Sequence, residues 1–223
     1  MREDDGWGSN EGSYEANPRT IKAKLRKMLL AGRSDHHDSK SAEAEDAIVH
    51  ADVARRFTER LIDLTGKEIG PGTIVATYLP MSSEPDITGF TDYLQTKGAI
   101  VLIPDLSVPP AGERVPFRLL DGQTLPSGVE SLEDLIQTKE IHTIVVPSLA
   151  LDQEGVRLGR GAGWYDRVLR RFTTGDSGYS EAPALIGVAF EDEFSAGEHL
   201  PREGHDQQMD YVVTEDRTLT VEK

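Results

Sequence analysis

Two amphipathic segments open the regular part of the chain. After Asn17-Pro18, a typical helix start, apolar side chains recur at helical spacing and predict a helix over residues 18 to 31: Ile21, Leu25, Met28 and Leu29. A second set with the same period predicts a long helix over residues 42 to 64: Val49, Val53, Phe57, Leu61 and Leu64. Both patterns have polar opposite faces, so each helix packs on one side only.

Runs of β-branched and other apolar residues then predict a buried sheet. The expected strands are residues 73 to 79, 99 to 103, 115 to 120, 143 to 146, 185 to 190 and 211 to 214. Helical patterns lie between them, at residues 87 to 94, 131 to 136 and 164 to 172. This alternation predicts a three-layer α/β/α fold with a mainly parallel, doubly wound, Rossmann-like sheet, as in sugar-phosphate isomerases and CoA transferases.

The segments outside this pattern are polar. Residues 1 to 16 predict a disordered acidic tail, and residues 17 to 223 a single catalytic α/β domain. A connector at residues 32 to 41 has no periodicity. It contains His36 and His37, which lack a third ligand nearby and are expected to be solvated.

Composition narrows the function. The formal net charge of −15 predicts no general binding to nucleic acid or anionic membranes, so an anionic ligand needs a local basic cluster. The chain has no cysteine, which rules out disulfides and thiolate chemistry. It has no apolar run of membrane-spanning length and no signal-peptide pattern, so we expect a cytoplasmic protein. We also expect a monomer.

A glycine-rich loop at residues 155 to 163 supplies such a cluster. Its glycines let backbone N–H groups approach an anion, Arg157 and Arg160 add charge, and a helix starts directly after it. A tight strand-to-helix turn is the structural alternative, and the two arginines favour the phosphate cradle. Lys22 and Arg26 lie four residues apart on one helix face, where two cations can reach one ligand. An ordinary solvated basic face is the alternative.

The end of the first predicted strand is a second candidate. Ligands of open α/β sheets bind beyond the carboxyl ends of strands, which makes Leu79, Met81 and Glu84 candidate pocket residues. An exposed loop acid is the alternative for Glu84. For Asp166 and Asp206, residue type alone favours a first-turn acid and a loop cap.

Four motifs in order resemble the 5-formyltetrahydrofolate cyclo-ligase family, also called 5,10-methenyltetrahydrofolate synthetases, over residues 18 to 216. They are Lys22-Ala-Lys-Leu-Arg26, Tyr78-Leu-Pro-Met-Ser-Ser-Glu84, Asp152-x-x-Gly155-x-Arg157-Leu-Gly-Arg-Gly-Ala-Gly-Trp-Tyr-Asp166 and His205-Asp206-x-x-x-Asp210. The resemblance implies an ATP- and Mg²⁺-dependent conversion of 5-formyltetrahydrofolate, possibly polyglutamylated, into 5,10-methenyltetrahydrofolate. ADP and phosphate are released, and the formyl group passes through an imino-phosphate.

The resemblance also assigns roles. Arg160 and Lys22 match catalytic positions, and Asp166 and Asp206 match magnesium positions, with His205 as a possible support for Asp206. The ATP-binding positions are Lys22, Arg26, Arg157, Leu158, Gly159, Arg160, Gly161, Ala162, Gly163, Trp164 and Tyr165. The folate-binding positions are Arg26, Leu79, Met81, Glu84 and Trp164.

Two residues depart from the usual family loop. Ala162 stands where relatives often carry glycine or lysine, and Trp164 where they carry tyrosine. The loss of a phosphate contact at Ala162 and a reshaped pterin site at Trp164 are the expected effects. Two alternatives to the cyclo-ligase remain: a sugar-phosphate isomerase-like enzyme, and a nucleotide-binding paralogue that has lost catalysis.

Overall fold

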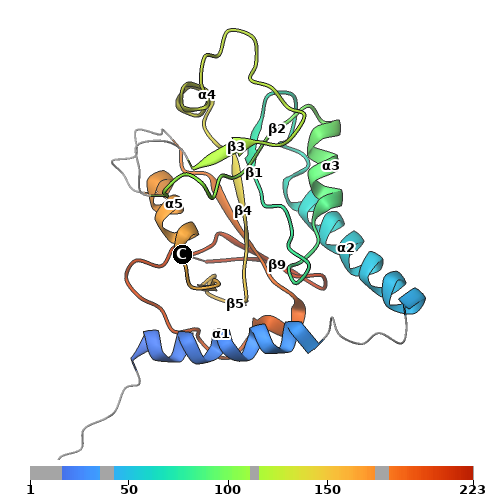
Figure 1. Ribbon diagram of the computed structural model, residues 1–223, viewed down its shortest axis with the longest axis vertical. Coiled ribbons are helices and arrows are strands. Elements are labelled where there is room, and N and C mark those ends of the chain that lie inside the picture. Colours follow the sequence, from blue (N-terminus) through green and yellow to red (C-terminus); the bar gives the residue numbers. More distant parts are fainter. Residues whose placement is uncertain (1–16, 36–42, 111–115, 174–180, 223) are drawn as a thin grey trace, which may run out of the picture.

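The computed structural model describes residues 17–35, 43–110, 116–173 and 181–222 (Figure 1). The predictions for residues 1 to 16, for His36 and His37 and for the start of the third strand at Val115 fall outside these ranges. Within them, no helix combines the length and the apolar character needed to cross a membrane.

A seven-stranded sheet forms the centre, in the order β10-β9-β7-β4-β1-β2-β3. The five inner strands, β9, β7, β4, β1 and β2, run parallel, while β3 and β10 are antiparallel edges. Their bounds are β1 Ile74–Ala76, β2 Ile100–Pro104, β3 Phe117–Leu119, β4 Thr143–Pro147, β7 Ala184–Val188, β9 Tyr211–Val213 and β10 Thr218–Thr220. The mainly parallel sheet is therefore confirmed.

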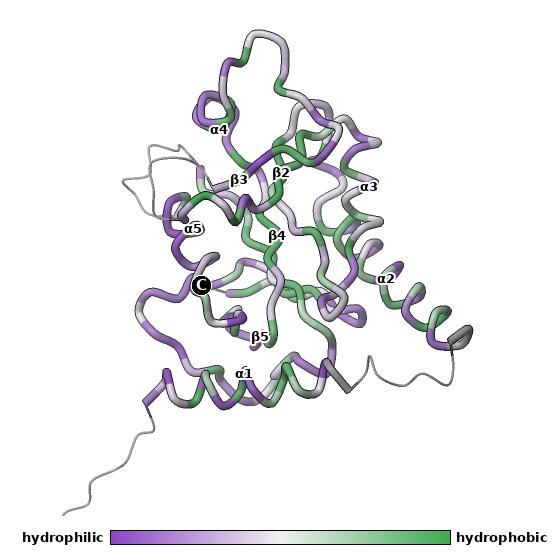
Figure 2. Tube along the Cα trace, in the orientation of Figure 1, coloured by the Kyte–Doolittle hydropathy of each residue, from purple (hydrophilic) through white to green (hydrophobic). Residues whose placement is uncertain are grey.

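Both faces of this sheet are buried, because successive side chains point to opposite sides. Ala76 and Val146 belong to one core cluster, and their neighbours Val75 and Val145 belong to another. Helices α4 (Leu132–Lys139) and α5 (Trp164–Thr173) cover the first face, and α2 (Glu43–Thr65) and α3 (Thr88–Thr96) cover the second. Figure 2 shows the apolar residues gathered along the central strands. The three-layer prediction is confirmed.

Helix α1 (Pro18–Asp35) does not belong to these layers and lies across one end of the molecule (Figure 1). No residue of α1 belongs to either core cluster, and its buried side chains in the described region are two cations, Lys22 and Arg33. Arg33 donates from Nη2 to the carbonyl of Ser148, directly after β4, at 2.7 Å. Helix α1 therefore docks at the carboxyl ends of the strands with these two cations buried, while Ile21, Leu25 and Leu29 are half-buried.

A small second sheet, in the order β6-β5-β8, is formed by segments between β4 and β9 of the main sheet and was not predicted. Strand β5 (Ala150–Asp152) pairs antiparallel with β6 (Arg157–Leu158) and parallel with β8 (Phe194–Ser195), which follows the short 3₁₀ helix η1 (Glu191–Glu193). The glycine-rich loop begins within this sheet, so its first arginine is part of a strand rather than of a free loop.

Several predicted bounds were inaccurate. Helix α1 continues past residue 31, because the single exposed Gly32 costs only about 1 kcal/mol in a helix. Strand β1 ends at Ala76 rather than at residue 79, although Thr77 N still donates to Leu102 O of β2 at 2.8 Å. Pro147 is included in β4 because it is the last residue of the ladder, and Ser148 N continues the bonding to Val188 O at 2.8 Å.

Candidate functional site

A cavity of about 790 Å³ opens at the carboxyl ends of β1, β2 and β4. Tyr78 and Leu79 follow β1, and Pro104 and Pro147 are the last residues of β2 and β4. After β1 the chain builds β2 and β3 on one side and then returns to place β4 on the other. The cavity therefore lies at the topological switch point, where doubly wound sheets bind ligands.

The cavity brings together every predicted site residue except one. Its lining includes Lys22, Arg26, Leu79, Met81, Glu84, Arg157, Gly159, Arg160, Gly161, Ala162, Gly163, Trp164, Tyr165, Asp166 and Asp206. The exception is Leu158, whose side chain is only 1% exposed and whose carbonyl accepts a hydrogen bond from Leu149 N. Its side chain therefore anchors the loop from within β6, and the ATP contact predicted for Leu158 stays a prediction.

The glycine loop has the backbone geometry that its sequence predicts. Gly161 has a φ of 102°, which is strained for any residue with a Cβ. A Cβ on Gly159 would lie 2.4 Å from Nη1 of Arg157, and this guanidinium is buried and cannot move away. Gly159 therefore lets Arg157 lie against the loop backbone.

Arg157 connects the loop to the helix that follows. Its Nη2 donates to both carboxylate oxygens of Asp166 at 3.1 Å, and its guanidinium lies 5.6 Å from the ring centroid of Tyr165. Two buried donors in this wall, Nε of Arg157 and Nε1 of Trp164, lack a hydrogen-bond partner among the described residues. Unpaired buried donors are costly, and a ligand rich in acceptors would satisfy them.

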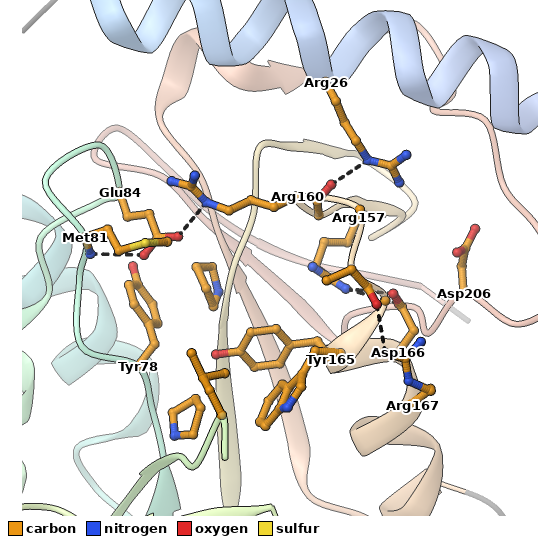
Figure 3. A pocket seen from close by; sticks show the side chains of 18 of the residues that line it. Arg26, Tyr78, Met81, Glu84, Arg157, Arg160, Tyr165, Asp166, Arg167 and Asp206 are labelled. Atoms are coloured by element: carbon orange, nitrogen blue, oxygen red, sulfur yellow. Dashed lines mark hydrogen bonds and ion pairs between the residues drawn. The ribbon is translucent and has the colours of Figure 1, made fainter. Parts of the chain in front are cut away.

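Two further arginines connect the loop to neighbouring segments, Arg26 from α1 and Arg160 from the loop itself (Figure 3). Arg26 donates from Nε to the carbonyl of Gly159 at 2.8 Å. Arg160 donates from Nε to Oε1 of Glu84 at 3.1 Å, and the other oxygen of Glu84 accepts from Met81 N at 3.1 Å. Because Glu84 is 8% exposed, the interpretation of this residue as an exposed loop acid is wrong.

Lys22 completes the basic end of the cavity from α1. Its Nζ lies 2.5 Å from Oδ2 of Asp206 and 3.2 Å from Oε2 of Glu203. Arg19 also contacts Glu203, at 2.8 Å. The hydrogen bond from Arg19, together with Lys22, holds the pKa of Glu203 below its usual value, so this carboxylate is ionised at neutral pH.

Three residues near Lys22, two acids and a histidine, are potential metal ligands. Glu203, His205 and Asp206 offer ligand atoms within 4.8 Å of one another. Asp206 Oδ2 also accepts from Glu203 N at 2.7 Å, which is the loop-capping role predicted from residue type. Asp166 lines the same cavity but binds Arg157. Carboxylate oxygens are ligands that Mg²⁺ prefers, so Glu203 and Asp206 are chemically suitable, while the assignment of Asp166 to the same ion stays a prediction.

The other end of the cavity is apolar and aromatic. Trp164 packs edge-on against Phe117 and Tyr165, with ring centroids 5.9 and 4.9 Å apart. Burial raises the pKa of the Tyr165 phenol, and raises that of Tyr78 as well, so both remain protonated at neutral pH. The hydroxyl of Tyr78 donates a hydrogen bond to the carbonyl of Pro85 at 2.8 Å. These phenols therefore shape the site and do not act as bases.

Several lining residues were not predicted. They include Arg19, Ile103, Leu106, Arg118, Arg167 and Glu203. Arg19 lies three residues before Lys22 on one helix, so the helical period was a usable signal. Glu203 lies three residues before Asp206 in a polar loop, and Arg118 lies on a short edge strand; neither position carried a pattern.

A Rossmann-like fold with an arginine-lined glycine loop at its switch point is typical of α/β enzymes that act on anionic ligands. A family model described as the 5-formyltetrahydrofolate cyclo-ligase family matches residues 18–215. The chain belongs to this family, and it is a ligase of folate one-carbon metabolism.

Individual relatives agree with this assignment. The 5-formyltetrahydrofolate cyclo-ligase of Mycolicibacterium smegmatis is 34% identical over 168 residues, which cover 70% of this chain and 80% of that one. A probable 5-formyltetrahydrofolate cyclo-ligase of Caenorhabditis elegans is 28% identical over 156 residues, covering 70% and 71%.

Solved structures share the fold. A 5,10-methenyltetrahydrofolate synthetase from Mycoplasma pneumoniae has a TM-score of 0.60 at 19% identity, covering 87% of this chain and 98% of that one. The Aquifex aeolicus 5,10-methenyltetrahydrofolate synthetase has a TM-score of 0.61 at 24% identity, covering 91% and 94%. These similarities confirm the predicted fold class.

Proposed function

We propose that this chain uses ATP to close 5-formyltetrahydrofolate to 5,10-methenyltetrahydrofolate, with ADP and phosphate as the other products. The observation that carries the proposal is one cavity with two chemically different ends. Glycine backbone and cations line one end, and aromatic and aliphatic side chains around the buried carboxylate of Glu84 line the other. A triphosphate suits the first end and a flat pterin suits the second.

The reaction needs ATP because a formamide oxygen is a poor leaving group. The formyl oxygen attacks the γ-phosphorus, the bond to ADP breaks, and an imino-phosphate forms. Nitrogen N10 then attacks the formyl carbon and loses its proton, and phosphate departs with the original formyl oxygen. Such chemistry asks the protein for positioning and for stabilisation of charge on phosphoryl oxygens.

The residues at the basic end are suited to both tasks. The backbone N–H groups of the glycine loop cradle the phosphates, with Arg26 and Lys22 approaching from α1. Arg160 reaches across the cavity between the two ends, since it contacts Glu84 and Ser83 from the loop. It is therefore the cation placed to stabilise the transferring phosphoryl group. The carbonyl of Ala162 accepts a hydrogen bond from Nη2 of Arg167 at 2.8 Å.

The apolar end accepts the folate. Leu79 and Met81 are each 49% exposed and offer apolar surface to the pterin, and Glu84 accepts its N–H donors once Arg160 turns to the phosphate. Trp164 adds an aromatic wall and an indole N–H without a partner among the described residues. Its edge-on packing against Phe117 fixes this wall in place.

Asp166 and Asp206 would hold Mg²⁺ together with the phosphates, and Glu203 lies beside Asp206. When bound, the ion would neutralise charge on the β- and γ-phosphates. The ion pairs of Lys22 with Asp206 and of Arg157 with Asp166 keep both carboxylates compensated before the substrates bind.

We also propose that the protein is a cytoplasmic monomer and acts without nucleic-acid or membrane partners.

The reaction is tested directly by mixing the purified protein with 5-formyltetrahydrofolate, Mg²⁺ and ATP and recording methenyl absorbance in the near ultraviolet. We expect an increase that requires ATP and matches the ADP formed. A protein that binds ATP but produces no increase is a non-catalytic paralogue. ATP-independent turnover of a sugar phosphate would instead establish the isomerase-like alternative.

Asp166→Asn tests the metal assignment. Asparagine preserves the helix start but removes one ligand charge, so we expect the Mg²⁺ concentration for half-maximal rate to increase about tenfold. The measurement is a Mg²⁺ titration of the rate at saturating substrates. Because Asp166 also binds Arg157, a loss of rate that no Mg²⁺ concentration restores would show that Asp166 only positions this arginine.

A further inference from the structure

The cations of the cavity are unevenly distributed. Six of the seven Lys and Arg residues in the described lining come from α1, the glycine loop and the first turn of α5: Arg19, Lys22, Arg26, Arg157, Arg160 and Arg167. The seventh, Arg118, comes from β3, which Figure 1 shows well separated from α1. Its neighbours in the lining are Ile103, Pro104 and Leu106, which have no charge. Arg118 therefore stands alone at the apolar end.

The charges on the two substrates fix how they lie relative to each other. ATP carries its phosphates to the glycine loop, and the reacting nitrogens of the folate must face them. A folate then continues from the pterin through an aromatic p-aminobenzoyl ring to a glutamate with two carboxylates. Since like charges repel, the glutamate has to point away from the phosphates, toward the apolar end and its single cation.

The surroundings of Arg118 match this part of the folate. Leu106 is 79% exposed at the cavity wall and offers apolar surface to the aromatic ring. Arg118 pairs with Ile103 in the antiparallel β2–β3 register, so its guanidinium is carried on a strand rather than on a loop. A guanidinium binds a carboxylate through two parallel N–H bonds.

Arg118 is also available for a new partner. Its side chain is 43% exposed, and its ion pair is with Asp121, which is 81% exposed, at 2.6 Å. Exposed pairs of this kind contribute little to stability, so the guanidinium can exchange Asp121 for a ligand carboxylate at little cost.

We propose that Arg118 recognises the glutamate carboxylates of the folate and thereby distinguishes folates that carry glutamate from pteroates that lack it. This assignment rests on the proposed function, since it takes the folate and the ATP phosphates as neighbours in one cavity. Because Arg118 lies far from the reacting atoms, we expect it to bind the glutamate equally well in the ground state and in the transition state, so that it sets affinity and leaves kcat unchanged.

The test compares two substrates, 5-formyltetrahydrofolate and the methylamide of 5-formyltetrahydropteroate, which has neither the glutamate nor a free carboxylate. For Arg118→Ala we expect KM for the glutamate-bearing substrate to rise about tenfold, the size of a charge-assisted hydrogen bond in a half-exposed site. We expect kcat for both substrates and KM for the pteroate to stay within about twofold. Equilibrium binding of each compound to the same variants gives a second readout that does not need turnover.

Two further variants separate recognition from structure. Arg118→Lys retains the charge and is expected to recover part of the affinity for glutamate. Asp121→Asn removes only the exposed partner and is expected to leave KM unchanged. A rise of KM for both substrates in Arg118→Ala, or no rise for either, overturns the proposal. A protein that never turns the folate over, but binds it in preference to the pteroate and loses this preference in Arg118→Ala, would contradict the proposed reaction and leave the role of Arg118 supported.

Discussion

Replacing Arg160 with alanine is expected to lower kcat by about 10²- to 10³-fold while weakening ATP binding only a few-fold. The phosphates retain the glycine backbone, Lys22 and Arg26 in this variant, so the ground state keeps most of its contacts. Charge on the transferring phosphoryl group peaks in the transition state, where Arg160 is the missing partner. The measurements are steady-state kcat and direct titration of ATP binding.

Two controls make this result specific. Arg55→Ala removes an arginine from an exposed ion pair on α2 and should leave kcat unchanged. Arg160→Lys retains a charge but loses the planar fork, so we expect an intermediate kcat. Since Glu84 still accepts from Met81 N without Arg160, the fold should persist, which a melting curve checks. Equal losses in kcat and in ATP affinity would reduce Arg160 to a simple binding residue.

Replacing Arg33 with alanine is expected to cost about 3–5 kcal/mol of unfolding free energy, the largest stability effect among these predictions. Arg33 holds both oxygens of Glu193 at 2.6 Å, and each side chain is only 6% exposed. Without the guanidinium, Glu193 is a buried charge with no cation beside it. Denaturant unfolding measures the loss, and Arg55→Ala is the exposed control, with a change below about 1 kcal/mol.

The pH dependence of this variant gives an independent check. Burial raises the pKa of Glu193 above its usual value even with Arg33 present, and the loss of Arg33 raises it further. A carboxyl with a raised folded-state pKa takes up a proton on folding, so its unfavourable contribution shrinks as the pH falls below that pKa. The deficit of Arg33→Ala relative to wild type should therefore decrease from pH 7 to pH 5. The double variant Arg33→Ala, Glu193→Leu should recover stability at both pH values.

The parts of the molecule predicted from sequence are those with a local physical signature. The helical period of α2 and the β-branched runs of β1, β2 and β4 placed the main layers, and the helical period of α1 placed the helix outside them. Cations and glycines within ten residues of one another, together with strand ends, marked the basic end of the cavity and Glu84.

The parts that were missed depend on contacts distant in sequence. Strand β6 consists of two residues and forms only because β5 lies beside it, and β10 reads Thr-Leu-Thr, a polar run stabilised by pairing with β9. Arg118 and Glu203 looked like ordinary surface charges. Their place in the site follows from β3 pairing with β2 and from α1 lying across the strand ends, which no short pattern encodes.

The position of α1 outside the core couples the docking of this helix to ligand binding. This helix contributes nothing to the two core clusters, yet it supplies Lys22 and Arg26 to the cavity. An anion bound at the glycine loop thus links α1 to the sheet through those side chains. By linkage, the free energy that docked α1 adds to ligand affinity equals the free energy that the ligand adds to the docking of α1. The amino-terminal helix and the bound anion therefore hold each other in place.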